Sequence, residues 1–212
     1  MPTFVALVAA LGGPPLLVIG TRWFFDGSPP FAVSVVLQLV YCGFAVFVLW
    51  TVLERERRPL ASIGLRKPRW STLAAGAGLW LIAFALLPVV MRPVYEWAGA
   101  APAIGVRALL AEPLWFRLVQ AMTGGIVEEV LYRGYAIERL SMLTERRWLA
   151  VALASLAFGL AHAPGWGVRY ALVADLPFGI LASLWYVWRR DLIANMLAHD
   201  VGLIVGVLSI SA

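Results

Sequence analysis

Seven long apolar runs constrain the fold of this 212-residue chain more than any other feature. They cover residues 4–20, 31–53, 71–91, 114–138, 148–162, 170–188 and 192–211. A helix needs about 20 mainly apolar residues to cross a bilayer, and each run reaches or approaches that length. Hydrophobic residues make up 62% of the chain and charged residues only 14%, which excludes a soluble globular domain. The sequence therefore predicts an all-α, polytopic transmembrane helical bundle of about seven spans, with residues 1–212 as a single integral membrane domain.

Proline residues are expected to mark the breaks between these runs, because proline lacks a backbone donor and is poorly tolerated inside a helix. The prolines expected at breaks are Pro29, Pro30, Pro59, Pro68, Pro93, Pro102, Pro113 and Pro164.

The distribution of lysine and arginine predicts the orientation. Six of the 17 basic residues lie in the segment 54–70. Five more fall in alternate connections, namely Arg139, Arg146, Arg147, Arg189 and Arg190. The positive-inside rule makes this set cytoplasmic, so the prediction is a multi-pass protein of the cell membrane with a cytoplasmic N-terminus. The basic residues separate apolar runs and form no stripe with interleaved aromatics, so the expected partner is the lipid bilayer and not a nucleic acid.

Two adjacent glutamates and an arginine interrupt the fourth run, in GGIVEEVLYRGY, residues 124–135. Charges at membrane depth cost several kcal/mol unless they pair or face water, so such residues are candidates for a functional site. Glu129 and Arg133 are four residues apart and can form an ion pair on one helix face, which favours a structural role. Glu128 is turned by about 100° from Glu129 and is the candidate for direct chemistry. The paired glycines before it are expected to allow close packing by another helix.

The only two histidines also lie in apolar runs, in LAFGLAHAPG and LIANMLAHDVG. Phe158 precedes His162 by four residues, and Asn195 precedes His199 by four, so each pair shares a helix face. A carboxylate and a histidine at low dielectric can activate water, which fits hydrolysis, although a lone intramembrane histidine can also serve only as a hydrogen-bonding group between helices. The same residue types can bind zinc, but there is no HExxH pair, so neither a metal nor another cofactor is expected.

These motifs resemble those of the CPBP family, the CAAX proteases and bacteriocin-processing enzymes related to the type II CAAX prenyl endopeptidase. EEVLYR is similar to the family motif EExxxR, and FGLAH is similar to FxxxH. The third family motif is a histidine followed four residues later by Asn or Asp. The resemblance covers about 90 residues from Gly124 to beyond His199, so residues 114–211 are expected to form the motif-bearing catalytic core.

The resemblance implies a role for each matching residue. Glu128 would activate water together with His162, and His199 would help to form the oxyanion site. Glu129, Arg133 and Phe158 would support these three catalytic residues.

The chain departs from the third motif, because Leu203 stands four residues after His199. Asn195 and Asp200 are the two candidates to replace the missing polar group. Asn195 is favoured because it shares a helix face with His199 and its amide can donate a hydrogen bond to an oxyanion. Asp200 is assigned a supporting role.

The leading functional hypothesis is an intramembrane endopeptidase that hydrolyses peptide bonds of membrane-associated or CAAX-like protein or peptide substrates. One alternative is a noncatalytic membrane scaffold or bacteriocin-immunity-type protein of the same fold, which the altered third motif favours. Another is a transporter or proton pathway, because chains of Glu, Arg and His also relay protons. The sequence contains no inverted repeat or pair of broken helices that would favour transport.

Overall fold

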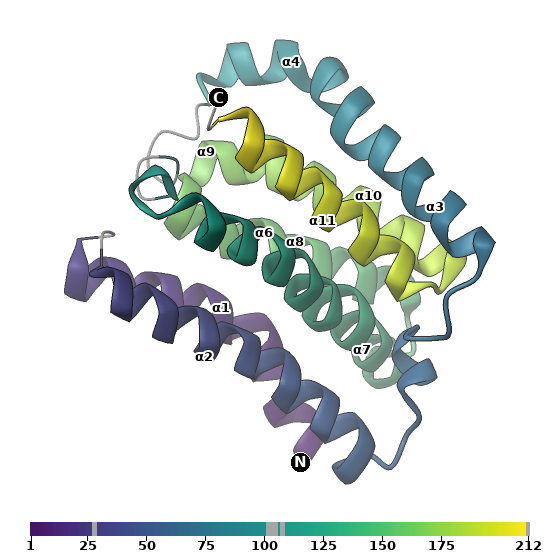
Figure 1. Cartoon of the computed structure of the whole chain (residues 1–212). Coiled ribbons are helices and arrows are strands. Elements are labelled where there is room, and N and C mark those ends of the chain that lie inside the picture. Colours follow the sequence, from purple (N-terminus) through teal and green to yellow (C-terminus); the bar gives the residue numbers. More distant parts are fainter. Residues whose placement is uncertain (27–28, 101–105, 107–108, 211–212) are drawn as a thin grey trace.

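The computed structural model describes residues 1–26, 29–100, 106 and 109–210, and these fold into helices with short connections (Figure 1). No strand occurs in these ranges. The prediction of an all-α bundle is confirmed. The helices, in chain order, are α1 (Pro2–Phe25), α2 (Phe31–Trp50), α3 (Trp70–Trp80), α4 (Leu87–Ala98), α6 (Leu114–Glu128), α7 (Glu138–Thr144), α8 (Arg147–Trp166), α9 (Val168–Tyr170), α10 (Leu176–Arg189) and α11 (Leu192–Ser209).

Shorter helical segments of other types join several of these helices. A 3-10 helix, η2 (Leu60–Ile63), lies between α2 and α3. The π-helical segments are η1 (Thr51–Arg55), η3 (Leu81–Leu86), η4 (Glu129–Ile137) and η5 (Ala171–Asp175). Each of η3, η4 and η5 follows one α-helix and continues without a break into the next. Each therefore lies within one long helix.

Six helical stretches in the described residues are long and apolar enough to cross a membrane. They are Pro2–Phe25, Phe31–Arg55, Trp70–Ala98, Arg147–Trp166, Val168–Arg189 and Leu192–Ser209. The remaining long helix runs through α6, η4 and α7 and contains the predicted fourth span. This helix has too many charged residues to be recognised as a membrane span by composition alone. Counted with the other six, it gives the predicted total of about seven spans.

Two of the prolines expected at breaks lie inside helices instead. Pro93 is within α4, and Pro164 is within α8. Membrane helices tolerate internal proline, since neighbouring helices and local adjustments satisfy the freed backbone groups. The expectation was right where a helix starts directly after Pro30, Pro59 or Pro113, whereas Pro102 lies outside the described residues.

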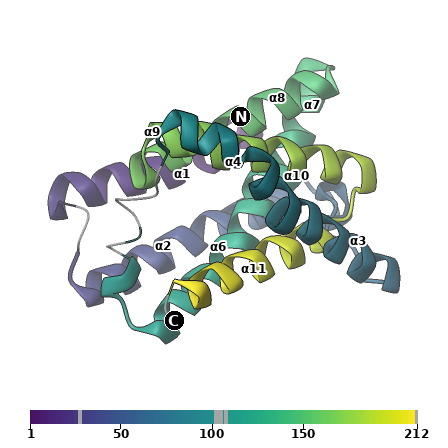
Figure 2. The ribbon, with the colours of Figure 1, turned by 90° about the horizontal axis from the view of Figure 1, so that it is seen from above.

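The helix formed by α6, η4 and α7 runs through the middle of the bundle (Figures 1 and 2). On one side α11 packs against both α6 and α3, and on another α8 packs against α1 and α10. Every residue of η4 is buried. The two charged residues of η4, Glu129 and Arg133, are therefore enclosed by protein, which removes the cost of exposing them to lipid.

Gly125 sets how closely α11 can approach this central helix. A Cβ atom on Gly125 would overlap Oδ1 of Asp200 and would lie 3.1 Å from its backbone nitrogen. Any larger residue would push α11 away. The expected close packing at the paired glycines is thus present, with Asp200 on the facing helix.

A buried ion pair fixes the α1–α2 pair against the end of the central helix. Glu56 accepts hydrogen bonds from Nε of Arg139 at 2.7 Å and from the hydroxyl of Tyr135 at 2.8 Å. Thr3, on α1, donates to the same carboxylate at 2.9 Å. Burial opposes ionisation of Glu56, but these bonds outweigh it and hold the pKa of Glu56 below its ordinary value.

Candidate active site

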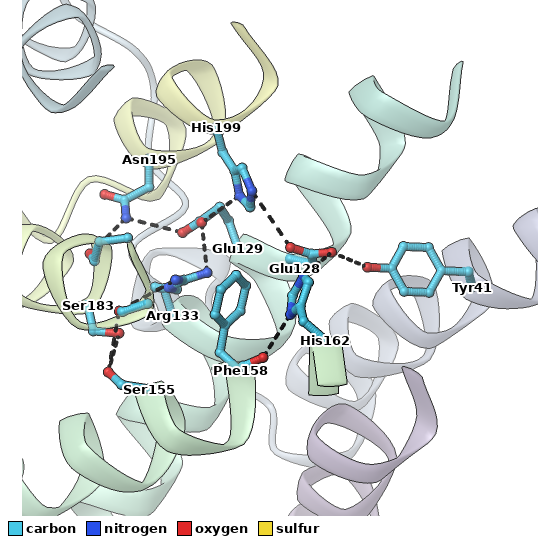
Figure 3. A network of polar contacts seen from close by, with 12 residues as sticks. Tyr41, Glu128, Glu129, Arg133, Ser155, Phe158, His162, Ser183, Asn195 and His199 are labelled. Carbon is cyan, nitrogen blue, oxygen red and sulfur yellow. Dashed lines mark hydrogen bonds and ion pairs between the residues drawn. The ribbon is translucent and has the colours of Figure 1, made fainter. Parts of the chain in front are cut away.

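Side chains from three segments that are distant in sequence meet beside the start of η4 (Figure 3). Glu128 and Glu129 come from the central helix, His162 comes from α8, and Asn195 and His199 come from α11. The structure therefore brings together the four residues expected to be catalytic and the glutamate expected to support them.

Glu129 is fully buried and is held by three side chains. Its Oε1 atom accepts a hydrogen bond from Nη1 of Arg133 at 2.9 Å, in the ion pair expected from the four-residue spacing. Nδ1 of His199 lies 3.0 Å from the same oxygen. Nδ2 of Asn195 donates to Oε2 at 3.1 Å. The carboxylate thus links the central helix to α11 at the level of the histidine.

Both histidines have their orientation fixed through Nδ1. Because an ionised Glu129 can only accept, Nδ1 of His199 carries the hydrogen of that bond. Nδ1 of His162 donates in the same way to the carbonyl oxygen of Phe158 at 2.8 Å. In the neutral form of each ring the lone pair is therefore on Nε2.

Glu128 lies between the two Nε2 atoms, with Oε1 3.8 Å from His162 and Oε2 3.7 Å from His199. These separations exceed a direct hydrogen bond and suit contacts bridged by water. The Glu128 side chain is 15% exposed, whereas Glu129 is completely buried. Of the two glutamates, Glu128 is therefore the one that an entering molecule can reach.

Tyr41 on α2 also reaches Glu128, and its hydroxyl donates to Oε1 at 2.9 Å (Figure 3). Sequence reasoning missed this residue. A signal was present, because Ser34, Gln38 and Tyr41 recur at helical spacing within an apolar run. All three bond to residues on or just before α6: Ser34 to Glu112, Gln38 to Thr123 and Tyr41 to Glu128. The polar face of α2 thus follows α6 to the site.

Asn195 was expected to donate a hydrogen bond to an oxyanion, but its amide is bonded within the protein. It shares a face with His199, as expected, but its Nδ2 atom donates both to Glu129 and to the carbonyl oxygen of Ala182, the latter at 2.9 Å. Both amide hydrogens are engaged. In this arrangement Asn195 has no hydrogen available for a substrate oxygen.

The other two residues around the altered third motif face α6. Asp200 lies against Gly125, and a Cβ on Gly124 would be 3.8 Å from Cδ1 of Leu203. Leu203 therefore packs at the helix interface, where the family motif would carry a polar side chain. Asn195, one turn before His199, is the residue of α11 whose amide contacts Glu129.

Aromatic rings enclose the buried ion pair and both histidines. The guanidinium carbon of Arg133 lies 4.0 Å from the ring centre of Phe158, which in turn is 4.6 Å from the His162 ring. The ring of Phe178, which was not predicted, is 4.6 Å from the His199 ring and 5.4 Å from the guanidinium carbon of Arg133. Such packing restricts the imidazole orientations and excludes water from the ion pair. No spacing in the sequence singles out Phe178.

The side chains around Glu128 include types that can bind a metal ion. Two imidazoles and a carboxylate are acceptable zinc ligands by type. Among the residues that the structure describes, however, no group of three or more His, Cys, Asp or Glu side chains is arranged to hold a metal ion.

Comparison with known proteins supports the resemblance seen in the motifs. Residues 110–201 match the family model described as Type II CAAX prenyl endopeptidase Rce1-like. The match includes Glu128, His162 and His199. Searches of the curated proteins and of the solved structures found no match to the chain.

Proposed function

We propose that this chain, whose segment 110–201 belongs to the type II CAAX prenyl endopeptidase Rce1-like family, is an intramembrane endopeptidase that uses Glu128 to activate water. The family match supports protease activity and a peptide or protein substrate. The observation that carries the finer proposal is the position of the Glu128 carboxylate, which lies between two imidazole Nε2 atoms at 3.8 and 3.7 Å.

In the proposed reaction, Glu128 removes a proton from water as the water oxygen attacks the carbonyl carbon of the scissile peptide bond. His162, oriented through its Nδ1 bond to Phe158, accepts the second hydrogen bond of that water and aligns it. Attack forms a tetrahedral intermediate with a negatively charged oxygen. The proton on Glu128 then passes to the leaving nitrogen as the carbon–nitrogen bond breaks, which releases an amine and a carboxylic acid and leaves Glu128 ionised again.

We assign stabilisation of the oxyanion to His199. In its protonated form the ring has a hydrogen on Nε2, which faces the reacting centre, while Nδ1 remains bonded to Glu129. Asn195 and Arg133 position Glu129 and have no contact with substrate in this proposal. Asn195 is therefore proposed as a positioning residue in place of the oxyanion donor expected from the sequence.

Comparative peptidomics tests the proposed activity and identifies substrates together. Membranes containing the wild type and membranes containing Glu128→Gln, at equal protein levels, should differ by a set of peptides cut at defined positions. Identical peptide sets, with purified wild type also inactive on membrane-anchored candidates, would favour the noncatalytic alternative.

The substrate class and the membrane are further parts of the proposal. A site enclosed by apolar helices supports substrates that are themselves membrane-associated, such as lipid-anchored or CAAX-like chain ends. The alternation of basic connections supports a cell membrane location with a cytoplasmic N-terminus.

Tyr41→Phe should lower kcat roughly tenfold, because removing a hydrogen bond to a charged group costs about 1.5–3 kcal/mol and leaves Glu128 less well oriented. The measurement is turnover of an identified substrate by purified variants. Tyr186→Phe is the matched control, because Tyr186 is also buried and donates to a carboxylate, Glu138, at 3.0 Å but is outside the site. Equal turnover in Tyr41→Phe and wild type would remove Tyr41 from the site.

We expect no stoichiometric zinc in the active protein, because Glu128 and His162 can activate water without a metal. The test is elemental analysis of chelator-washed protein, with turnover measured on the same samples. One zinc per chain that is lost and regained together with activity would overturn this expectation and favour a metalloprotease.

A further inference from the structure

A positively charged hollow lies outside the candidate active site, where the connection before α3 meets the turn between α10 and α11. Its volume is about 230 Å³. Five basic residues and one acidic residue contribute to its lining, together with two hydroxyl side chains. The lining residues are Arg66, Lys67, Arg69, Ser71, Thr72, Arg189, Arg190 and Asp191.

The positive charge of this hollow is mostly uncompensated. Asp191, its only carboxylate, already accepts hydrogen bonds from the hydroxyl of Thr72 at 2.7 Å and from the backbone nitrogen of Ala194 at 3.2 Å. Among the basic residues, Arg190 is paired with Glu138 at 2.8 Å. Arg66 and Lys67 are exposed and have no ion pair within the described part of the chain. The hollow therefore presents free hydrogen-bond donors and net positive charge.

Two tryptophans place the hollow at the depth of lipid head groups. Trp70, at the start of α3, is 86% exposed, and Trp188, near the end of α10, is 68% exposed. Exposed tryptophans next to apolar spans are typical of the membrane–water interface. The N-termini of α3 and α11 lie at the same place and add the positive ends of two helix dipoles.

We propose that this hollow binds the phosphate-bearing head group of an anionic phospholipid. Arginine, lysine and hydroxyl donors around one point are the groups that bind phosphate oxygens. Basic pockets between helices at the membrane surface suit anionic head groups, whereas the ammonium group of a zwitterionic lipid would be repelled by the same cations. The bound lipid would lie at the N-terminus of α11, the helix that carries Asn195 and His199, but the proposal does not depend on proteolysis.

Thermal unfolding of the full chain in dodecyl maltoside tests this proposal. Dioleoyl phosphatidylglycerol should raise the unfolding temperature with a saturating dose dependence, and dioleoyl phosphatidylcholine should not. Arg66→Gln combined with Lys67→Gln should weaken the apparent affinity for phosphatidylglycerol about 30-fold, since each basic residue at a membrane surface contributes about a factor of five. Arg189→Gln, at the end of α10, should weaken it about fivefold.

The matched control is Arg58→Gln combined with Arg146→Gln, which removes two charges from basic connections outside the hollow. This variant should respond to phosphatidylglycerol as the wild type does. An equal loss in the control would attribute the effect to general surface charge and overturn the proposal. So would an equal shift with inorganic phosphate alone, which indicates a free anion, or displacement of the lipid by a short peptide with a free C-terminal carboxylate.

Discussion

Glu128→Gln is expected to lower turnover by at least 10²-fold, the scale of a general base, while the protein remains folded. The amide of glutamine has nearly the shape of the carboxylate, so the hydrogen bond from the Tyr41 hydroxyl at 2.9 Å can still form. It cannot accept the proton of an attacking water. The measurement is kcat on one identified substrate, with the unfolding temperature recorded on the same preparation.

Glu138→Gln is the matched control for this prediction. Glu138 is also on the central helix and also accepts a hydrogen bond from a tyrosine, but that tyrosine is Tyr186 and the contact is remote from both histidines. This control should retain turnover. More than about a tenth of wild-type activity in Glu128→Gln would be too much for the loss of a general base and would exclude that role.

Glu129→Gln should have the largest effect on stability. The substitution leaves the guanidinium of Arg133, which is completely buried, without its anionic partner. Breaking a buried ion pair from one side typically costs about 3–5 kcal/mol, which corresponds to a fall of roughly 10 °C or more in unfolding temperature for a chain of this size. Turnover should fall as well, because His199 loses the acceptor that holds its Nδ1 atom.

A double variant separates the two consequences of losing Glu129. Glu129→Gln combined with Arg133→Met removes the stranded charge, so part of the lost stability should return. Activity should stay low, because nothing then fixes His199. If Glu129→Gln unfolds at the wild-type temperature and is nevertheless inactive, Glu129 is the base and the two glutamates exchange roles.

The sequence was sufficient to single out the motif residues that the structure brings together, because each is unusual for its surroundings. Glu128, His162 and His199 stand out in apolar runs, and the cost of a polar group in the membrane makes such positions informative. The four-residue spacing of Glu129 and Arg133 also predicted a contact that the structure contains. The packing of aromatic rings around the two histidines, by contrast, leaves no such signal in one sequence. Phe178 therefore could not be predicted.

Asn195 shows what reasoning from a single helix leaves out. Its helix face was correctly predicted, but the direction of its amide depends on Ala182 and Glu129, which belong to other helices. Pro93 and Pro164 give the same lesson for helix boundaries, because the groups that satisfy an interrupted helix lie in its neighbours. Contacts between distant segments, and not local preference, determine both the direction of the Asn195 amide and the continuity of the helices at Pro93 and Pro164.

The enclosure of the central helix also has a consequence for biogenesis. A helix with Glu128, Glu129 and Arg133 near its middle partitions poorly into lipid by itself. On insertion scales, the free-energy cost of an arginine or an acidic residue at the centre of a span is about 2.5–3.5 kcal/mol. Several of the partners that shield these groups, including His162, Asn195 and His199, are synthesised later. We therefore expect this helix to enter the lipid only once α8 and α11 have been made and can pack against it.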